Sequence, residues 1–403
     1  MLEPGASDVE LIRAAARNHW SWMARGAQAA GGEVVRERGL RWIAPPAGGE
    51  AALPFPAAPS RPALDRMLAG CRARGARGVA CWASGLEPTG ELAARLVARG
   101  FEWGWQPHWM VIDLAHAPSD ADDPRVSLVE VVPEYGDHGQ AVLALAGARP
   151  RRFWHAVARV DGAYAGHAWA HVVDGRLGGA GIYDVEVAPE HQRKGLGRAL
   201  TAAVCRQAAA SGARVATLNA TGEGELLYRS LGFRSLGHGQ TWWLHSPGLK
   251  APPPAELVAL AEAAGRGDVG SLARLAPAPA LLAARLANGY DAPHVALHAG
   301  HREAAAWLVD HGAPLDAVLA WDLGGEERLT ALARDDRAAL DAPVDPDGST
   351  VLHVAVWRGD IALLELALSL GADRERRDTA HDATAAEWAR YFGREDLATR
   401  LRA

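Results

Sequence analysis

Short apolar runs separated by polar turns occupy the middle of the chain. Five of these runs are short and rich in Val, Ile, Ala or aromatic residues, which is typical of strands. They are residues 126–132, 153–160, 163–173, 182–187 and 215–220. Asp161-Gly162 separates two of them, and an Asp-Gly pair between apolar runs is a strong signal for a β-hairpin. The Ala- and Leu-rich residues 198–210 predict a helix, so this region reads as a hairpin followed by strand, helix and strand.

The N-terminal part has a similar mixed pattern. Helix-like periodicity at 63–74 and 90–99 alternates with strand-like runs at 78–83 and 109–114. Between Pro133 and Arg151, by contrast, only a short helical stretch fits the pattern.

Two polar breaks divide the chain. Residues 115–124 are acidic and bounded by prolines, and residues 246–254 end in three consecutive prolines, which favour an extended linker. A length of 403 residues also exceeds one ordinary domain. We therefore expect domains at 1–115, 125–246 and 255–403.

The C-terminal part contains an internal repeat. Gly267, Gly300, Gly359 and Gly393 each separate two helical patterns. The first two and the last two of these glycines lie about 33 residues apart, a period that indicates stacked helix pairs, because one pair cannot bury its apolar face alone. The middle interval, from Gly300 to Gly359, is a little less than twice as long. It therefore fits two repeats, one of them shortened.

The loop between the predicted strand 182–187 and the following helix carries the most specific motif. Gln192, Gly195 and Gly197 have the spacing Q-x-x-G-x-G. In a strand–loop–helix setting, successive backbone amides point into one concavity at the helix start, where unpaired N–H groups and the helix dipole favour an anion. Glycine at these positions lets a phosphate approach the backbone closely.

This loop resembles the pyrophosphate loop of the GNAT N-acetyltransferase superfamily. Leu226-Leu-Tyr-Arg-Ser-Leu-Gly-Phe233 resembles the family's L-Y-x-x-L-G-F segment, and the resemblance covers roughly residues 125–250. The N-terminal helix–strand–helix–strand order resembles the second half of a GNAT domain but lacks the phosphate loop. It implies a degenerate repeat that does not bind CoA; an unrelated small α/β domain is the alternative.

The C-terminal repeat resembles ankyrin repeats. Thr350-Val-Leu-His-Val-Ala-Val-Trp-Arg-Gly-Asp360 stands where that family has T-P-L-H-x-A-A-x-x-G-H, with Val351 in place of proline. His294 and His353 fall at the repeat's structural histidine position, where backbone hydrogen bonding explains them. The expected fold class is thus an α/β GNAT fold with a mixed, mostly antiparallel sheet, in tandem with a degenerate GNAT-like half and followed by an all-α ankyrin-repeat solenoid.

The GNAT resemblance implies acetyl-CoA as the cofactor. It places the pantetheine arm along the backbone of the strand 182–187 and the pyrophosphate on the loop amides. Arg193 and Lys194 could add positive charge near the phosphates, although they are explained nearly as well as solvated loop residues. Asn219 could equally be a plain turn residue. The expected cofactor-binding residues are Val185, Val187, Gln192, Arg193, Lys194, Gly195, Leu196, Gly197, Arg198 and Asn219.

Three side chains are candidates for the chemistry. Ile182-Tyr-Asp-Val-Glu-Val187 resembles the I-Y-D-L-A-V strand of GNAT aminoglycoside 3-N-acetyltransferases, so Asp184 is the candidate base, or else it binds a cationic substrate. Glu186 would share its face by alternation and could do the same work. Tyr228 stands at the family's tyrosine near the CoA sulfur, where it would protonate the thiolate, or it fills the gap between helix and sheet.

Other aromatic and histidine side chains have plainer explanations. His167, Trp169 and His171 alternate on one strand face and could line an acceptor pocket, but half-exposed sheet residues are the commoner explanation. Trp242 and Trp243 are expected to pack rather than to serve as stacking platforms.

Composition narrows the classes of partner that the chain could bind. The net charge of −6 and the scattered basic residues give no footprint for nucleic acid. No apolar stretch of about 18 residues occurs and no signal core opens the chain, so a cytoplasmic protein without membrane contact is expected. Three cysteines without ligand spacing predict neither a metal site nor a disulfide set.

The leading interpretation is an acetyl-CoA-dependent N-acetyltransferase in which a primary amine attacks the thioester directly in a ternary complex. Acidic acceptor residues favour a small cationic, antibiotic-like amine. The alternatives are a protein acceptor recruited by the ankyrin surface, or a non-catalytic module that binds CoA or a partner. The oligomeric state stays open.

Overall fold

The computed structural model describes residues 2–37, 39–46, 48–57, 59–117, 122–129, 132 and 143–402. It divides into two compact units, one made of Met1–Thr89 with Glu102–Lys250 and the other of Gly90–Phe101 with Ala251–Ala403. The domain limits expected from the sequence stay a prediction. Part of the predicted strand 126–132 and of the helical stretch between Pro133 and Arg151 lies outside the described residues.

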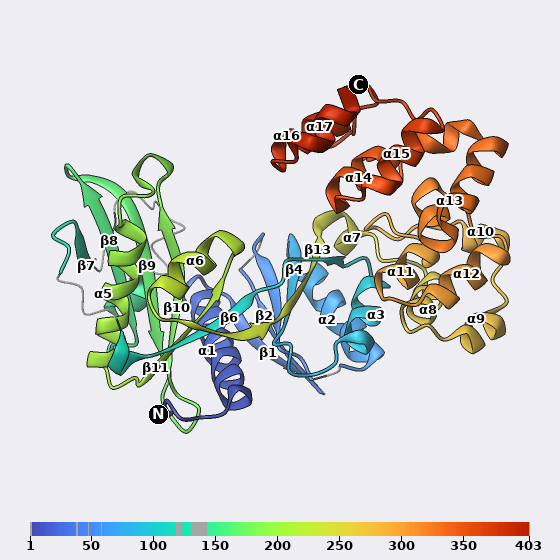
Figure 1. The fold of residues 1–403 in the computed structure, drawn as a ribbon. Coiled ribbons are helices and arrows are strands. Elements are labelled where there is room, and N and C mark those ends of the chain that lie inside the picture. The colour runs from blue at the N-terminus through green and yellow to red at the C-terminus, as the bar shows by residue number, and fades with distance from the viewer. Residues whose placement is uncertain are drawn as a thin grey trace. The chain divides into compact units, whose positions relative to one another are not determined.

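The first unit contains two mixed β-sheets (Figure 1). The six-stranded sheet has the order β1 (Glu33–Glu37), β2 (Leu40–Ala44), β3 (Glu50–Pro54), β4 (Gly78–Ala83), β13 (Gln240–His245) and β5 (Glu102–Trp103). Its one parallel pair, β3 with β4, is joined through helix α2 (Arg61–Ala73). The other strand pairs are antiparallel.

The seven-stranded sheet carries the motif region. Its order is β12 (Arg234–His238), β6 (His108–Asp113), β11 (Val215–Ala220), β10 (Ala180–Val187), β9 (Ala163–Val172), β8 (Phe153–Val160) and β7 (Val126–Val129). Two helices lie against one face, α5 (Leu196–Ala210) and α6 (Gly222–Ser230). They bury a cluster of Leu200, Val204, Tyr228 and Phe233 with Met110 and Leu218 of the sheet.

The two sheets exchange strands. Strand β6 comes from the N-terminal part of the chain, yet it pairs with β11 and β12 of the seven-stranded sheet. Strand β13 follows β12 in sequence, yet it pairs with β4 and β5 of the six-stranded sheet. Each sheet therefore needs a strand from the other half of the unit.

A long helix that the sequence pattern did not single out packs against the other face of the seven-stranded sheet. Helix α1 (Asp8–Ala29) begins with a capping box, in which Ser7 and Glu10 satisfy each other's backbone amides. It contacts strands of both sheets. The pattern S-x-x-E ahead of an apolar run would have predicted this helix start.

The second unit is a stack of helix pairs. The pairs are α8 (Ala255–Gly265) with α9 (Val269–Leu275), α11 (Ala292–His298) with α12 (Arg302–Asp310), the two halves of α13 (Ala317–Asp335), α14 (Val351–Arg358) with α15 (Ile361–Ser369), and α16 (Ala385–Tyr391) with α17 (Glu395–Arg402). Shorter elements are α10 (Pro279–Leu282) and a 3₁₀ turn at Arg337–Leu340. In the first unit, 3₁₀ turns lie at Leu114–His116 and Pro189–His191.

A kink explains the irregular repeat spacing. Gly325 interrupts α13 with φ 60°, as Gly300 and Gly359 end their inner helices with φ 82° and 71°. Gly325 thus divides the interval between Gly300 and Gly359 into a shortened repeat, which comes first, and one of ordinary length. The prediction of a shortened repeat is confirmed.

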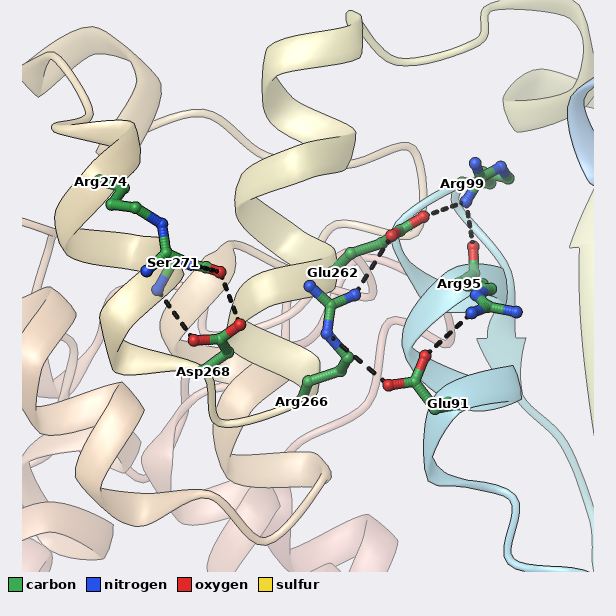
Figure 2. Close-up of polar contacts among 8 residues, drawn as sticks. All are labelled: Glu91, Arg95, Arg99, Glu262, Arg266, Asp268, Ser271 and Arg274. Atoms are coloured by element: carbon green, nitrogen blue, oxygen red, sulfur yellow. Dashed lines mark hydrogen bonds and ion pairs between the residues drawn. The ribbon is translucent and has the colours of Figure 1, made fainter. Parts of the chain in front are cut away.

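A helix from the N-terminal part completes this stack. Helix α3 (Gly90–Val97) packs against α8, and the guanidinium of Arg99 donates to Glu262 at 2.6 Å with both side chains buried (Figure 2). The side chain of Asn288 donates to the carbonyls of Val97 and Phe101. Residues 90–101 therefore belong physically with the repeats.

The predicted extended linker is only partly correct. Residues Ser246–Lys250 form a short helix, α7, whose Leu249 is buried, and only 251–254 are without regular structure. The three cysteines are buried and unpaired. No helix among the described residues has the length and apolar character needed to cross a bilayer.

Candidate functional site

Two parallel strands separate at the centre of the seven-stranded sheet. Strands β10 and β11 pair only at Ala180 with Ala216 and at Gly181 with Thr217. From Ile182 onward the inner edge of β10 has no partner strand among the described residues, so its backbone groups face the space between the strands. The corresponding parallel pair in the other sheet, β3 with β4, stays paired along the whole of β3.

The continuous pairing in the six-stranded sheet agrees with a degenerate repeat. A further bond from the Phe55 amide to the Trp82 carbonyl extends the β3–β4 pairing beyond the strand. A ligand arm cannot add to β3 on that side, because its backbone groups are already used.

A β-bulge lies where β10 separates from its neighbour. Tyr183 faces Trp169 and Glu186 faces His167, so two residues of β10 lie opposite one residue of β9. Asp184 sits in the bulge with φ 54°, a left-handed conformation that Asp tolerates better than most residues. Simple alternation, which the sequence argument used to put Asp184 and Glu186 on one face, is therefore interrupted here.

The bulge nevertheless brings Asp184 and Glu186 to the same histidine. Oδ2 of Asp184 lies 3.1 Å from Nε2 of His167, and His167 is the cross-strand neighbour of Glu186. The hydroxyl of Tyr164 lies 2.5 Å from Nδ1 of the same ring. His167 is buried, whereas the Asp184 side chain is 61% exposed. The result is a chain of three polar groups that ends in an accessible carboxylate.

The hydrogen bond from His167 controls the charge of that carboxylate. It lowers the pKa of Asp184 below its ordinary value, against a smaller opposing effect of burial. Asp184 is therefore ionised at neutral pH. A general base works best with a pKa near the working pH, so this direction favours cation binding over direct proton abstraction.

The loop after β10 has the conformation expected of an anion nest. Gly195 is the N-cap of α5 with φ 82°, and no side chain caps this helix start. The first backbone bond of the helix runs from Ala199 to Gly195. The amides of Leu196 and Gly197 precede it and point out of the helix end, which leaves donors for an anion.

Glycine is needed at the two loop positions for different physical reasons. An added Cβ at Gly195 would meet no atom within 4 Å, so its positive φ is what requires glycine. At Gly197 a Cβ would approach Leu227 of α6 to 3.1 Å. Gly197 therefore sets the close packing of α5 on α6, a constraint that the sequence motif alone did not reveal.

Most cationic side chains of the loop bond to the protein itself. Lys194 Nζ donates to the Glu190 carbonyl, and Arg198 donates to the Ser230 carbonyl. Arg193 has φ 62° and an exposed side chain, and no acidic partner for it lies among the described residues. Of the three, Arg193 is thus the best placed to meet a phosphate.

The backbone groups predicted on β10 are consistent with a bound arm. Ala188 donates to the Ala165 carbonyl of the neighbouring strand, so the groups of Val187, one residue earlier, face the opposite edge. There the Val187 carbonyl accepts from Gln192 Nε2 at 3.2 Å. Val185 lies within the bulge itself.

Tyr228 and Asn219 lie on opposite faces of the separated strands. Tyr228 is buried against α5 in the cluster that holds Leu218, and burial raises its pKa to about 12. Asn219 pairs with Trp109 on β6, and its Nδ2 atom is buried with no hydrogen-bond partner among the described residues. A buried donor without a partner is costly, so a ligand carbonyl here would relieve that cost.

Helix α1 supplies residues that the sequence argument missed. Trp22 stacks on Tyr183, with ring centroids 4.8 Å apart, and Asn18 accepts from the Tyr183 hydroxyl at 2.7 Å. The interpretation of His167, Trp169 and His171 as half-exposed is wrong: all three are buried, and His171 bonds to Ser21 of α1. Trp242 is fully buried, as packing requires.

The two repeat histidines differ. His353 contacts the Thr350 backbone and the Ala383 carbonyl, as expected. His294 does not follow the backbone explanation, because its Nδ1 lies 2.7 Å from Asp291 and its Nε2 3.1 Å from Asp316. Burial lowers its pKa, but the two carboxylates outweigh this and raise the pKa to about 10. Within the described residues, no group of three or more His, Cys, Asp or Glu gathers to hold a metal ion.

Comparison with known proteins matches two segments of the chain to known families. Residues 121–233 match the family model of the acetyltransferase (GNAT) family, and residues 347–379 match the ankyrin repeat. The chain contains a GNAT acetyltransferase domain. The matched domain holds β10, the bulge, the loop and Tyr228.

Solved structures of the same family also resemble the chain. A GCN5-related N-acetyltransferase from Kribbella flavida is 19% identical, covers 57% of this chain and 95% of its own, and has a TM-score of 0.42. A tandem GNAT protein from the clavulanic acid biosynthesis pathway is 18% identical, with coverages of 58% and 95% and a TM-score of 0.38. No curated protein matches the chain. These scores are low, so the assignment rests on the family models.

Proposed function

We propose that the chain transfers an acetyl group from acetyl-CoA to a primary amine by direct attack in a ternary complex. The observation that carries the proposal is the separation of β10 from β11 directly beside the uncapped start of α5. An extended arm can add to the inner edge of β10 while its phosphates meet the amides of Leu196 and Gly197. Asn219 lies on β11 beyond the last pair with β10, and its buried Nδ2 is a further donor without a partner among the described residues.

Acetyl-CoA supplies the activated thioester. The residues named for it are the backbone of Val185 and Val187, the loop from Gln192 to Arg198, and Asn219. The roles proposed for Tyr228 and Asp184 follow from their burial and charge.

Tyr228 acts best as a hydrogen-bond donor to the departing sulfur. A phenol with a pKa of about 12 stays protonated at neutral pH, yet an ordinary thiol has a pKa of about 8.5, so full proton transfer to a thiolate is uphill. A hydrogen bond to the developing charge lowers the barrier without that transfer. Tyr228→Phe should slow turnover by roughly a hundredfold while CoA affinity stays nearly unchanged. An unchanged turnover would remove Tyr228 from the mechanism.

Asp184 is the proposed contact for a cationic acceptor. Its carboxylate is ionised and exposed, and Glu186 places a second exposed carboxylate beside the same histidine. Two carboxylates suit a small polycationic amine. The alternative acceptor is a protein recruited through the ankyrin repeats. The buried, unpaired thiols suit a reducing compartment such as the cytoplasm.

The test combines binding with turnover. Calorimetric titration with acetyl-CoA should give one saturable site, and Gly195→Glu should abolish it, because a side chain at φ 82° strains the loop and a carboxylate repels phosphate. Release of the CoA thiol is then followed with a panel of small polyamines and of peptides. Asp184→Asn should lower kcat/KM for the amines, with Glu190→Gln as the control carboxylate. No binding by the wild type would leave a non-catalytic partner-binding module as the function.

A further inference from the structure

A cavity rich in arginine lies on the first unit, away from the proposed acyltransfer site. Its volume is about 370 Å³, and it lies between α1, β2 and the adjoining ends of β8 and β9. Arg17 and Arg25 come from α1, Arg41 from β2 and Arg152 from the residues before β8. Along β9 the cavity reaches His171, four residues from His167, which corresponds to about 13 Å of strand.

The charges in this cavity are unbalanced. Four guanidinium groups face one carboxylate, that of Asp174, whereas the whole chain carries a net charge of −6. Arg152 donates to Asp174 at 2.8 Å, which neutralises one of the four. Within the described residues, Arg17, Arg25 and Arg41 form no ion pair with a carboxylate. The cavity therefore holds an excess of about three positive charges.

The arginines are arranged by α1 and by one aromatic ring. Arg17, Ser21 and Arg25 are spaced by four residues and so share one face of α1. Arg41 lies over the ring of Trp20, with its central carbon 4.2 Å from the ring centroid. Ser21 is fixed by its 3.0 Å contact with His171.

The sheet adds to this charge instead of relieving it. Arg36 of β1 lies directly opposite Arg41 in the strand register, and like charges in that position repel each other. Partial burial and this neighbouring charge lower the pKa of Arg41. An anion bound in the cavity would offset both the repulsion and the unpaired charges.

We propose that this cavity binds a small phosphorylated polyanion at a site separate from the acyltransfer centre. One guanidinium group can bind two oxygens of a phosphate at once, and the three unpaired arginines, two on α1 and one on β2, can together hold two phosphate groups. The cavity volume falls within the range of small-molecule sites. The site does not depend on the proposed function, because none of its residues belongs to the GNAT motif.

The test is calorimetric titration of the full chain with inorganic pyrophosphate, in the presence and absence of excess CoA. One site should persist with CoA present, since the pyrophosphate loop is then occupied. Arg17→Gln with Arg41→Gln should weaken it at least tenfold. The control is Arg66→Gln with Arg72→Gln, which removes the same charge from α2 outside the cavity and should leave the affinity unchanged.

A variant that should tighten binding distinguishes loss of the site from misfolding. Asp174→Asn removes the competing carboxylate and frees Arg152, so it should tighten pyrophosphate binding severalfold. Binding that disappears with CoA, or that survives unchanged in the Arg17 and Arg41 double variant, would overturn the proposal. In either case the pyrophosphate would be bound at the loop from Gln192 to Arg198 or by surface charge alone.

Discussion

The buried ion pair between Arg99 and Glu262 should govern the stability of the second unit. Glu262 is completely buried, and Arg99 is 4% exposed (Figure 2). The carboxylate also receives a second arginine, Arg266, at 3.3 Å. Glu262→Gln keeps the size and shape of the side chain but removes its charge, so the buried guanidinium of Arg99 loses its carboxylate partner.

The expected loss of stability follows from this burial. Breaking a buried pair by removing one partner costs about 3–5 kcal/mol. The lower end applies here, because the Gln oxygen can still accept a bond from Arg99, and Arg266 is partly solvated. We expect about 3 kcal/mol, which corresponds to roughly a hundredfold larger opening constant. Arg99→Met combined with Glu262→Leu should lie within about 1 kcal/mol of the wild type, because no buried charge remains.

Amide hydrogen exchange followed by mass spectrometry measures the local loss of stability in the full chain. Peptides from α3 and α8 should exchange about a hundredfold faster in Glu262→Gln. Glu365→Gln is the matched control, since Glu365 pairs with Arg400 on the same unit and both are about half exposed. It should cost less than about 1 kcal/mol. If Glu262→Gln changed exchange no more than this control, the argument from burial would be refuted.

Three further predictions concern pH and truncation. His167→Phe removes the bond that lowers the pKa of Asp184, so the acidic fall of kcat/KM should move to higher pH; an unmoved limb would separate His167 from the site. Protonated His294 stabilises the repeats, since its pKa of about 10 exceeds the ordinary 6.5. That contribution is complete below pH 6.5 and is lost as the pH rises to about 10, so melting temperatures should fall over this window in the wild type and stay flat in His294→Gln. Deleting residues 251–403 should destabilise the remainder, because residues 90–101 lose the unit that buries Arg99; a cooperative, wild-type melt of the truncated chain would contradict this.

Local features of the sequence determined the loop that we propose to bind the cofactor. The loop Q-x-x-G-x-G and the strand and helix around it are contiguous, so their conformation depends on neighbours close by in the chain. Gly195 of this motif has a positive φ, which glycine adopts without strain. The same holds for the repeat glycines, since each helix pair is a short segment with its own turn. The shortened repeat at Gly325 was predicted by spacing alone, although only the structure showed which residue makes the turn.

Only the tertiary structure decided the surroundings of Asp184, the proposed acceptor contact, and the arginine cavity. The bulge at Asp184 arises from pairing with β9, so it has no signature in the sequence of β10 itself. Trp22 and Asn18 reach Tyr183 from a helix near the N-terminus, far away in sequence. The exchange of β6 and β13 and the pairing of Arg99 with Glu262 likewise join distant segments. Such contacts depend on how sheets and helices pack, and a pattern of neighbouring residues carries no record of which distant element it will meet.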